Sequence, residues 1–424
     1  MPADAAAAQL LSALALALAF AGCGTVEEPH LPPPHPADAA AHPLSHDDCV
    51  RLAIASAPNA AAFTARRLAA EARLRAASAW PNPTLGVSLE DMGLDRSIAQ
   101  QTVTLGMSLS ALFTHGYRTA AAEHDHDAAV AVLEHEVQQL ELEVRSAYDE
   151  LVAARERAAL QADAVAVAAR AVAAARRFAA AGVGSPTAAD TAQATLTEAE
   201  LDRTAAVANA ARLAIAFAFA LGFERPVELQ LSEPVTPASA PPADADGLLR
   251  DALAARADLR AATAHYAAEL ERAHLAASPA RFLPTISAGP RFIGSSPFWV
   301  ANVDVELPLF DAGGAAIDEQ NAVLLQAAAD IRRTAQQVGV DVALALADRT
   351  AAQQLGQQTG PLIDMRASLL ARAERQFAAG EIDYAGMLAA ASASIAARLH
   401  GVDARLQAGL AANRLQAALG ARAQ

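Results

Sequence analysis

The side chains that could carry chemistry in this sequence are scattered rather than clustered. Four histidines lie in a proline-rich stretch near the N-terminus: His30, His35, His42 and His46. They could bind a metal ion, but no spacing fixes a coordination geometry, so a solvated linker is the favoured interpretation. His124 and His126 are two residues apart and therefore lie on different faces of a helix. The chain has no Gly-rich phosphate loop and no Gly-x-Ser-x-Gly motif. We therefore expect no catalytic site, no metal site and no cofactor.

One cysteine stands where a lipid would be attached. An apolar segment, Leu10 to Ala21, runs into Phe20-Ala21-Gly22-Cys23, which is similar to a bacterial lipobox, where the cysteine is acylated and becomes the mature N-terminus. We expect residues 1–22 to be a lipoprotein signal peptide and residues 23–46 a lipid-anchored, proline-rich tether. A plain secretory signal is the alternative. Several acyl chains, palmitate among them, would hold the protein stably to a membrane.

The longest regular element predicted is a helix from His115 to Ala181. It contains no proline and one glycine, at its very start, and would be roughly 100 Å long at 1.5 Å per residue. Its apolar residues form a heptad seam: Val130, Leu133, Val137, Leu140, Val144, Ala147 and Leu151. After a break at Gly182 to Pro186, a second helix returns over residues 187–221, so the two predict a long antiparallel hairpin of coiled-coil type.

The stretch before this hairpin has the period of strands. Leu85, Val87 and Leu89 alternate with polar residues and glycine, and so do four apolar residues from Val103 to Leu109. Each run has the length and pattern of an outer-membrane barrel strand. A half-buried hairpin of a soluble protein would give the same alternation.

The whole pattern returns about 200 residues later, which indicates an internal duplication. A helix over 246–277 is followed by strand-like alternation from Thr285 to Phe292 and from Asn302 to Leu307, a long helix over 315–379 and a final helix ending at Leu419-Gly420. The expected boundaries are 47–222 for the first repeat, 223–245 for an equatorial linker, 246–420 for the second repeat and 421–424 for a tail.

Four strands with open edges cannot remain in a bilayer, because every backbone amide there must be paired. Three protomers would supply a closed twelve-stranded barrel continued by a helical tube. The fold class predicted is thus a mixed α/β membrane protein, internally duplicated and trimeric. The acidic residues Glu90, Asp304 and Glu306 would line the barrel lumen and favour cations. The net charge of −15 argues against nucleic-acid binding.

Over essentially its whole mature length the chain resembles the outer-membrane factor (TolC-like) family. The two helix–strand–strand–helix–helix repeats carry this resemblance, with the strand entries Pro83-Thr84-Leu85 and Pro284-Thr285-Ile286, the motif Leu309-Phe310-Asp311-x-Gly313-Gly314 and the two Leu-Gly helix ends. The resemblance implies a homotrimeric duct without catalytic activity. It also implies that a periplasmic adaptor (membrane fusion protein) and an inner-membrane pump, of RND type, dock at the tips of the hairpins. The corresponding positions are Gly182, Gly184, Ser185, Pro186, Gly380, Glu381, Ile382 and Asp383.

Family members narrow the tube near the tips with charged side chains, which makes Arg372, Glu374, Glu381 and Asp383 candidates for a gate, although such charges are usually a solvated helix face.

We therefore expect a passive duct for small substrates in a tripartite efflux system. It would lie in the bacterial outer membrane, lipid-anchored on the periplasmic side, with its helical tube in the periplasm. Asn82-Pro83, Glu90-Asp91-x-Gly93 and Gly182-x-x-Ser185-Pro186 resemble the heavy-metal branch of the family, so heavy-metal cations are the favoured substrate. A duct for drugs or for a type I secretion system is the alternative. A periplasmic adaptor or a structural coiled-coil lipoprotein is a more distant one.

Overall fold

The computed structural model describes residues 42–92, 98–182, 186–232, 244–293, 296–379 and 381–420. These residues fall into two compact units. The first contains Arg67–Val130 and Ala261–Ile331, and the second contains the described residues of 42–66, 131–260 and 332–420. Each unit therefore combines segments from both halves of the sequence.

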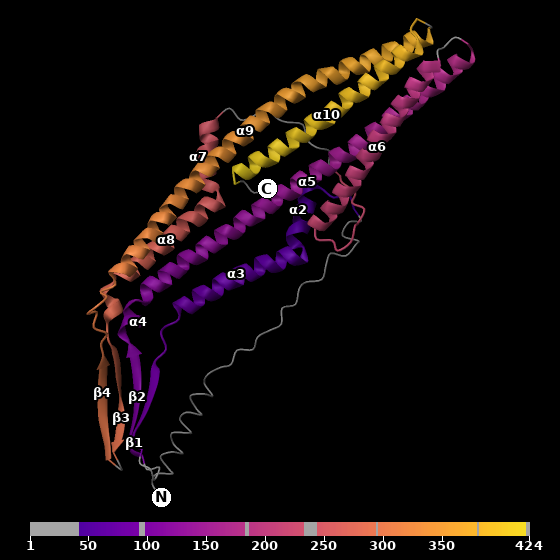
Figure 1. Ribbon diagram of the computed structural model, residues 1–424. Coiled ribbons are helices and arrows are strands. Elements are labelled where there is room, and N and C mark those ends of the chain that lie inside the picture. Colours follow the sequence, from indigo (N-terminus) through magenta and orange to yellow (C-terminus); the bar gives the residue numbers. More distant parts are fainter. Residues whose placement is uncertain are drawn as a thin grey trace. The chain divides into compact units, whose positions relative to one another are not determined.

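The first unit holds one antiparallel sheet. Its strands are β1 (Thr84–Met92), β2 (Ile98–Ser108), β3 (Thr285–Ile293) and β4 (Ser296–Asp304), and they pair in the order β1-β2-β3-β4 (Figure 1). The central β2–β3 pair joins the two repeats, with Leu105 opposite Ala288. The prediction of two strands per repeat is confirmed, and β1 and β4 are the edges of this sheet.

The fourth strand differs from the prediction in its position. The sequence pattern placed it up to Leu307, but β4 begins at Ser296 and ends at Asp304, opposite Thr285. Pro284 precedes Thr285 and has no backbone N–H, and Pro308 lacks one as well, so the ladder cannot extend past this pair. Glu306 consequently lies beyond the last paired residue.

Four long helices form the hairpins. In the first repeat they are α5 (His115–Ala180) and α6 (Pro186–Ala220), and in the second α9 (Gly314–Ala378) and α10 (Tyr384–Ala418). The heptad residues Val144 and Leu151 of α5 are buried in one cluster with Phe217 of α6, as the two ladders predicted. Among the described helices, α5 alone contains a window apolar enough to cross a membrane by length and composition, and only 22% of that window is buried.

The helix that opens each repeat is broken, where the sequence predicted one continuous helix. The first repeat has α2 (His46–Ala55) and α3 (Ala57–Ser78), and the second has α7 (Ala245–Ala255) and α8 (Ala257–Ala277). At the first break, a Cβ on Gly222 would lie 2.2 Å from the Cβ of Ser56. At the second, a Cβ on Gly420 would lie 3.2 Å from the Cα of Arg256. Both glycines have positive φ, so each Leu-Gly helix end packs its backbone against the break of the preceding helix pair.

Shorter elements complete the chain. The capping box of Ser45 and Asp48 starts α2, which buries Cys49 completely, as expected for a small apolar side chain. After β2 the chain forms α4 (Leu109–Phe113), and a 3-10 helix, Pro279–Phe282, precedes β3. Leu231, in the linker between the repeats, forms an isolated bridge with Leu44.

Candidate functional site

One face of the sheet is predominantly apolar, and that face is exposed. Directly opposite residues share a face, and the register places one apolar row across all four strands: Leu85, Val87, Leu89, Val103, Leu105, Met107, Ile286, Ala288, Phe292, Trp299, Ala301 and Val303. Leu85 is 50% exposed, Leu105 60% and Val303 63%. Since the described residues do not cover this row, the sheet differs from the half-buried hairpin of a soluble protein.

The opposite face is mixed, with most of its polar residues on β1 and β2, several of them hydrogen-bonded. It carries Thr84, Ser88, Glu90, Gln100, Thr102, Thr104, Ser287, Arg291, Asn302 and Asp304, and also the apolar Ile293, Phe298 and Val300 of β3 and β4. Glu90 accepts hydrogen bonds from Gln100, its cross-strand partner, and from Ser88, and Arg291 Nε donates to Thr102 Oγ1 at 3.1 Å. Two of the three predicted lumen carboxylates, Glu90 and Asp304, thus share this face. Glu306 follows β4 and belongs to neither row.

A glycine lets β2 and β3 pair closely at the centre of the sheet. A Cβ on Gly289 would lie 1.9 Å from the carbonyl oxygen of Val103, so no other residue fits there without moving the strands.

The predicted docking tips are described in part. Gly182, with φ +70°, lies in the turn that follows α5, and Pro186 is the first residue of α6. Glu381 and Ile382 form the turn before α10, and Asp383 caps that helix by accepting the Gly386 N–H at 2.8 Å. Gly184, Ser185 and Gly380 lie outside the described residues, as does the predicted lipidation site, Cys23.

Of the gate candidates, Arg372 and Glu374 are exposed on the last turns of α9, and within the described residues neither makes an ion pair. An aromatic pair beside them escaped the sequence analysis, with the rings of Phe377 and Tyr384 5.4 Å apart. Burial raises the pKa of the Tyr384 hydroxyl, and the charges of Arg170 and Arg177 oppose that shift only in part. No sequence signal marked this pair, because it joins two helices across the turn.

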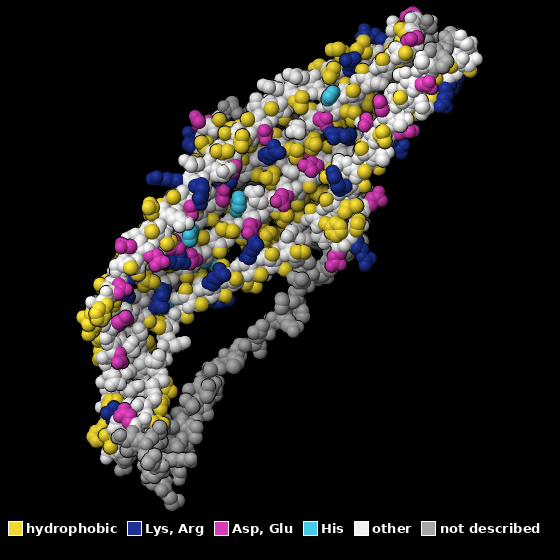
Figure 2. All heavy atoms as spheres, in the orientation of Figure 1, with side chains coloured by type: hydrophobic (Ala, Val, Ile, Leu, Met, Phe, Trp, Pro, Cys, Tyr) yellow, Lys and Arg dark blue, Asp and Glu magenta, His cyan; other side chains and the backbone are white. Residues whose placement is uncertain are grey.

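Ion pairs connect α5 with α10 in the second unit. Arg157 pairs with Asp403 and Arg405 with Glu156, and Arg398 lies 3.2 Å from Asp163. All six side chains are at least one third exposed, so each pair is worth at most about 1 kcal/mol. Figure 2 shows basic and acidic side chains interspersed over the helices rather than gathered into one patch.

The second unit also contains a buried ion pair at the α7–α8 break. Arg256 has a side chain only 7% exposed, and it contacts Asp258 with two nitrogens and Asp341 with a third at 2.8 Å. Burial disfavours the charge of Arg256, but the two carboxylates outweigh it and raise the pKa of the guanidinium. Burial would likewise raise the pKa of Asp258, but Arg256, and less strongly His135, hold it below its ordinary value.

A buried carboxylate joins the two repeats within this unit. Asp149 of α5, with a side chain 4% exposed, lies 2.9 Å from His46 Nε2 and accepts a hydrogen bond from Asn413 of α10. Tyr148 beside it donates to the carbonyl of Leu44. These contacts tie the start of α2 to both hairpins.

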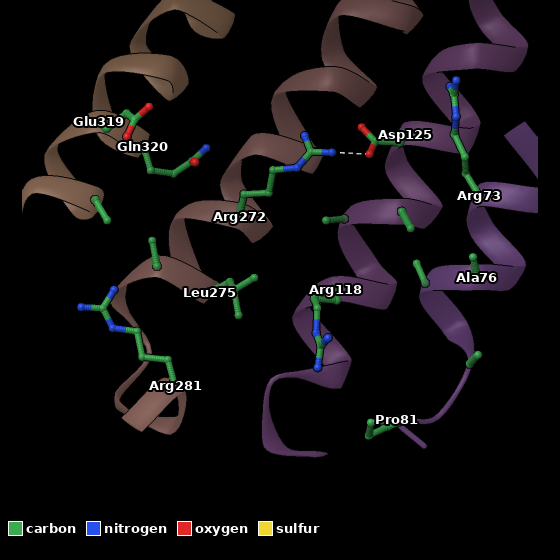
Figure 3. Close-up of a pocket in the computed structure, with 16 residues that line it drawn as sticks. Arg73, Ala76, Pro81, Arg118, Asp125, Arg272, Leu275, Arg281, Glu319 and Gln320 are labelled. Carbon is green, nitrogen blue, oxygen red and sulfur yellow. Dashed lines mark hydrogen bonds and ion pairs between the residues drawn. The ribbon is translucent and has the colours of Figure 1, made fainter. Parts of the chain in front are cut away.

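The first unit has a cavity of about 840 Å³ that the sequence analysis did not anticipate. It lies between α3, α5, α8 and the start of α9 (Figure 3), and its polar lining is Arg73, Arg118, Asp125, Arg272, Arg281, Glu319 and Gln320. Figure 3 shows the ion pair of Arg272 with Asp125 across the middle of this cavity. Its four arginines come from positions 73 to 281, so their proximity could not be deduced from sequence spacing.

The motif Leu309-Phe310-Asp311-x-Gly313-Gly314, which leads into α9, positions one of these arginines, Arg281. Asp311 accepts the N–H of Gly313, and Gly313 has φ +81°. A Cβ there would lie 1.3 Å from the Arg281 guanidinium, which donates to the carbonyl of Ala312 at 2.7 Å. The motif therefore forms a turn in which Gly313, having no side chain, leaves room for the Arg281 guanidinium against the backbone.

Possible metal ligands are dispersed. Within the described residues, no group of three or more His, Cys, Asp or Glu side chains is arranged to hold a metal ion.

Comparison with known proteins agrees with this architecture. Residues 49–222 match the family model described as outer membrane efflux protein. Comparison with the curated proteins finds no match. Among solved structures, the outer-membrane channel OprN matches with 18% identity, a TM-score of 0.75 and coverage of 94% of this chain and 99% of that one.

Two further channels give similar values. The outer membrane protein VceC of Vibrio cholerae has 19% identity and a TM-score of 0.71, over 89% of this chain and 96% of that one. The MtrE outer membrane channel of Neisseria gonorrhoeae has 18% identity and a TM-score of 0.70, over 89% of each chain. The first repeat is thus matched by the outer membrane efflux protein family, and the chain has the fold of solved outer-membrane channels.

Proposed function

We propose that this chain is one protomer of a homotrimeric outer-membrane duct of an efflux system, in which three four-stranded sheets close into a barrel continued by a helical tube. The observation that carries the proposal is the sheet, which has an exposed apolar row on one face, carboxylates on the other and unpaired edges at β1 and β4. A bilayer tolerates such a sheet only when it is closed.

Exposed apolar side chains on the long helices support the trimer. On α9, Leu325 is 72% exposed and Leu344 60%, and on α6, Leu201 is 65% exposed. Side chains of this size on helices that extend from a closed barrel would be covered by neighbouring protomers.

The partners proposed are a periplasmic adaptor and an inner-membrane pump of RND type, docking at the turns Gly182–Pro186 and Gly380–Asp383. The exposed side chains of Glu381 and Asp383 support access to a partner. We assign Arg372, Glu374, Glu381 and Asp383 to the narrow end of the tube. The cap that Asp383 provides to α10 would hold this turn in one conformation.

Metal cations are the substrate class we favour, with drugs as the alternative. The support is the carboxylate of Glu90 and that of Asp304 on one face of the sheet, which would form acidic rings in a trimer. An acyl anchor on Cys23 would add a second attachment to the outer membrane.

The test is extraction of the protein from outer-membrane fractions into detergent, with the mass of the particle and its conductance in planar bilayers as readouts. We expect a trimer that forms ion-conducting pores. The Cys23→Ser variant should stay in the membrane pellet through a high-salt wash, because the barrel holds it there. A monomer that washes off would instead support a periplasmic adaptor.

A further inference from the structure

One basic side chain stands among the carboxylates on the face of the sheet opposite the apolar row. Arg291 of β3 is the only basic residue within β1 to β4. The register places it opposite Thr102 of β2 and Phe298 of β4, and Thr102 is in turn opposite Ser88 of β1. Glu90 lies two residues beyond Ser88 and therefore shares the face with Arg291. Both signs of charge thus occur on the face that would line the lumen of the proposed barrel.

Uncharged partners hold both of these side chains. Arg291 Nε donates to Thr102 Oγ1 at 3.1 Å, and Thr102 is only 6% exposed, so the guanidinium lies over β2. Glu90 accepts hydrogen bonds from Ser88 and Gln100. Within the described residues, Arg291 makes no ion pair. Because no ion pair among these residues neutralises the guanidinium, its charge acts on ions that pass this face.

The distances along the sheet keep the carboxylates from compensating Arg291. Strands are about 4.8 Å apart and rise about 3.4 Å per residue, so the backbones of Glu90 and Arg291 are about 12 Å apart. Asp304 lies opposite Thr285, which is about 20 Å along β3 from Arg291. That distance exceeds the Debye length of about 8 Å at physiological salt. Arg291 and Asp304 therefore act on passing ions independently.

Closure of the barrel would arrange these charges as a ring. The strand order β1-β2-β3-β4 would repeat in each protomer of a trimer, so Glu90 on each β1 and Arg291 on each β3 would alternate at every second strand. On its β4 side Arg291 has Phe298, an apolar side chain that is 52% exposed. An apolar neighbour screens the guanidinium less than water does. The ring would hold equal numbers of positive and negative charges.

We propose that Arg291 is a specificity-determining residue of the duct, which cancels the cation preference that Glu90 alone would give to this level of the lumen. Rings of charged side chains select ions in pores by attracting one sign of charge and repelling the other. Ion preference would then depend mainly on the ring formed by Asp304, at the end of the sheet where β4 leads toward α9. The inference rests on the proposed function, because it requires this face to line a closed barrel.

Reversal potentials of the purified protein in planar bilayers, across a KCl gradient, test the role of Arg291. Arg291→Gln should raise the cation-over-anion permeability ratio by about twofold, the effect of one charge about 8 Å from an ion in water. Arg291→Lys keeps the charge and is the matched control, so its ratio should stay that of the wild type. Glu90→Gln should shift the ratio in the opposite direction, and the double variant Glu90→Gln, Arg291→Gln should return it to the wild-type value. At about 1 M salt these differences should shrink, since the Debye length falls to about 3 Å.

Particle mass is measured on the same samples, and Arg291→Met is a second neutral variant for the case that Arg291→Gln does not assemble. Conducting trimers in which the neutral variants leave the ratio unchanged, or lower it, would overturn the role of Arg291 and leave the duct intact. An equal rise in Arg291→Lys would trace the effect to the shape of the side chain and not its charge, which would overturn the inference as well. A wild-type protein that forms no conducting trimer would overturn the duct and this inference together.

Discussion

At the scale of single residues, the carboxylates on the polar face of the sheet should set ion preference. A charge about 8 Å from an ion in water contributes about 0.5 kcal/mol, a factor of about two in local concentration. We expect Glu90→Gln to lower the cation-over-anion permeability ratio by about that factor, measured from reversal potentials in a salt gradient. Glu90→Asp keeps the charge and should keep the ratio. An unchanged ratio in Glu90→Gln would show that Glu90 does not face the pore.

Arg256 is a residue whose removal should destabilise the fold. Truncating one partner of a buried ion pair leaves uncompensated charge and costs about 3 kcal/mol. Arg256→Met should therefore lower the melting temperature at neutral pH, whereas Arg398→Met, at an exposed pair, should change it little.

The ion pair of Asp258 also predicts a pH dependence. Because the folded pKa of Asp258 lies below its ordinary value of 3.8, its stabilisation is present above that pH and is lost as pH falls through the folded pKa. The difference in melting temperature between wild type and Asp258→Asn should thus be constant near neutral pH and shrink only below about pH 4. A difference that disappears near pH 6 would mean that another group controls it.

At the scale of elements, adjacent residues of one strand should respond in opposite ways to the same substitution. Val87 and Ser88 of β1 are both exposed but lie on opposite faces. An arginine facing lipid costs about 2–4 kcal/mol at the bilayer midplane, whereas one facing a lumen is solvated. Val87→Arg should reduce the amount of trimer in outer membranes, and Ser88→Arg should not, by native gel of membrane extracts. Equal loss in both variants would argue against a lipid-facing row.

The elements also show where sequence reasoning succeeds. Long helices without proline and strands with strict alternation are predictable, because local period and propensity agree with the fold. The helix break before Pro58 had a local signal in that proline, but the break at Arg256 had none. The break at Arg256 depends on the backbone of Gly420, more than 160 residues away, and on Asp341 of α9. The arginine cavity is of the same kind, since contacts between repeats assemble it.

At the scale of the whole molecule, the proposed barrel predicts an edge-to-edge contact between protomers, because β1 and β4 are the edges of the four-stranded sheet. A closed barrel pairs β4 of one protomer with β1 of the next, and the apolar row should continue across that seam. Cysteines at Val303 and at Leu85, Val87 or Leu89 should then give cross-linked dimers and trimers on denaturing gels, at one of the three registers. Leu105→Cys with Ala288→Cys is the internal control, because these residues are direct partners within one chain and should yield cross-linked monomers only. If the edge pairs also yield only monomers while the control pair forms its disulfide, the strands do not close between protomers. The exposed apolar row would then have to be covered in some other way.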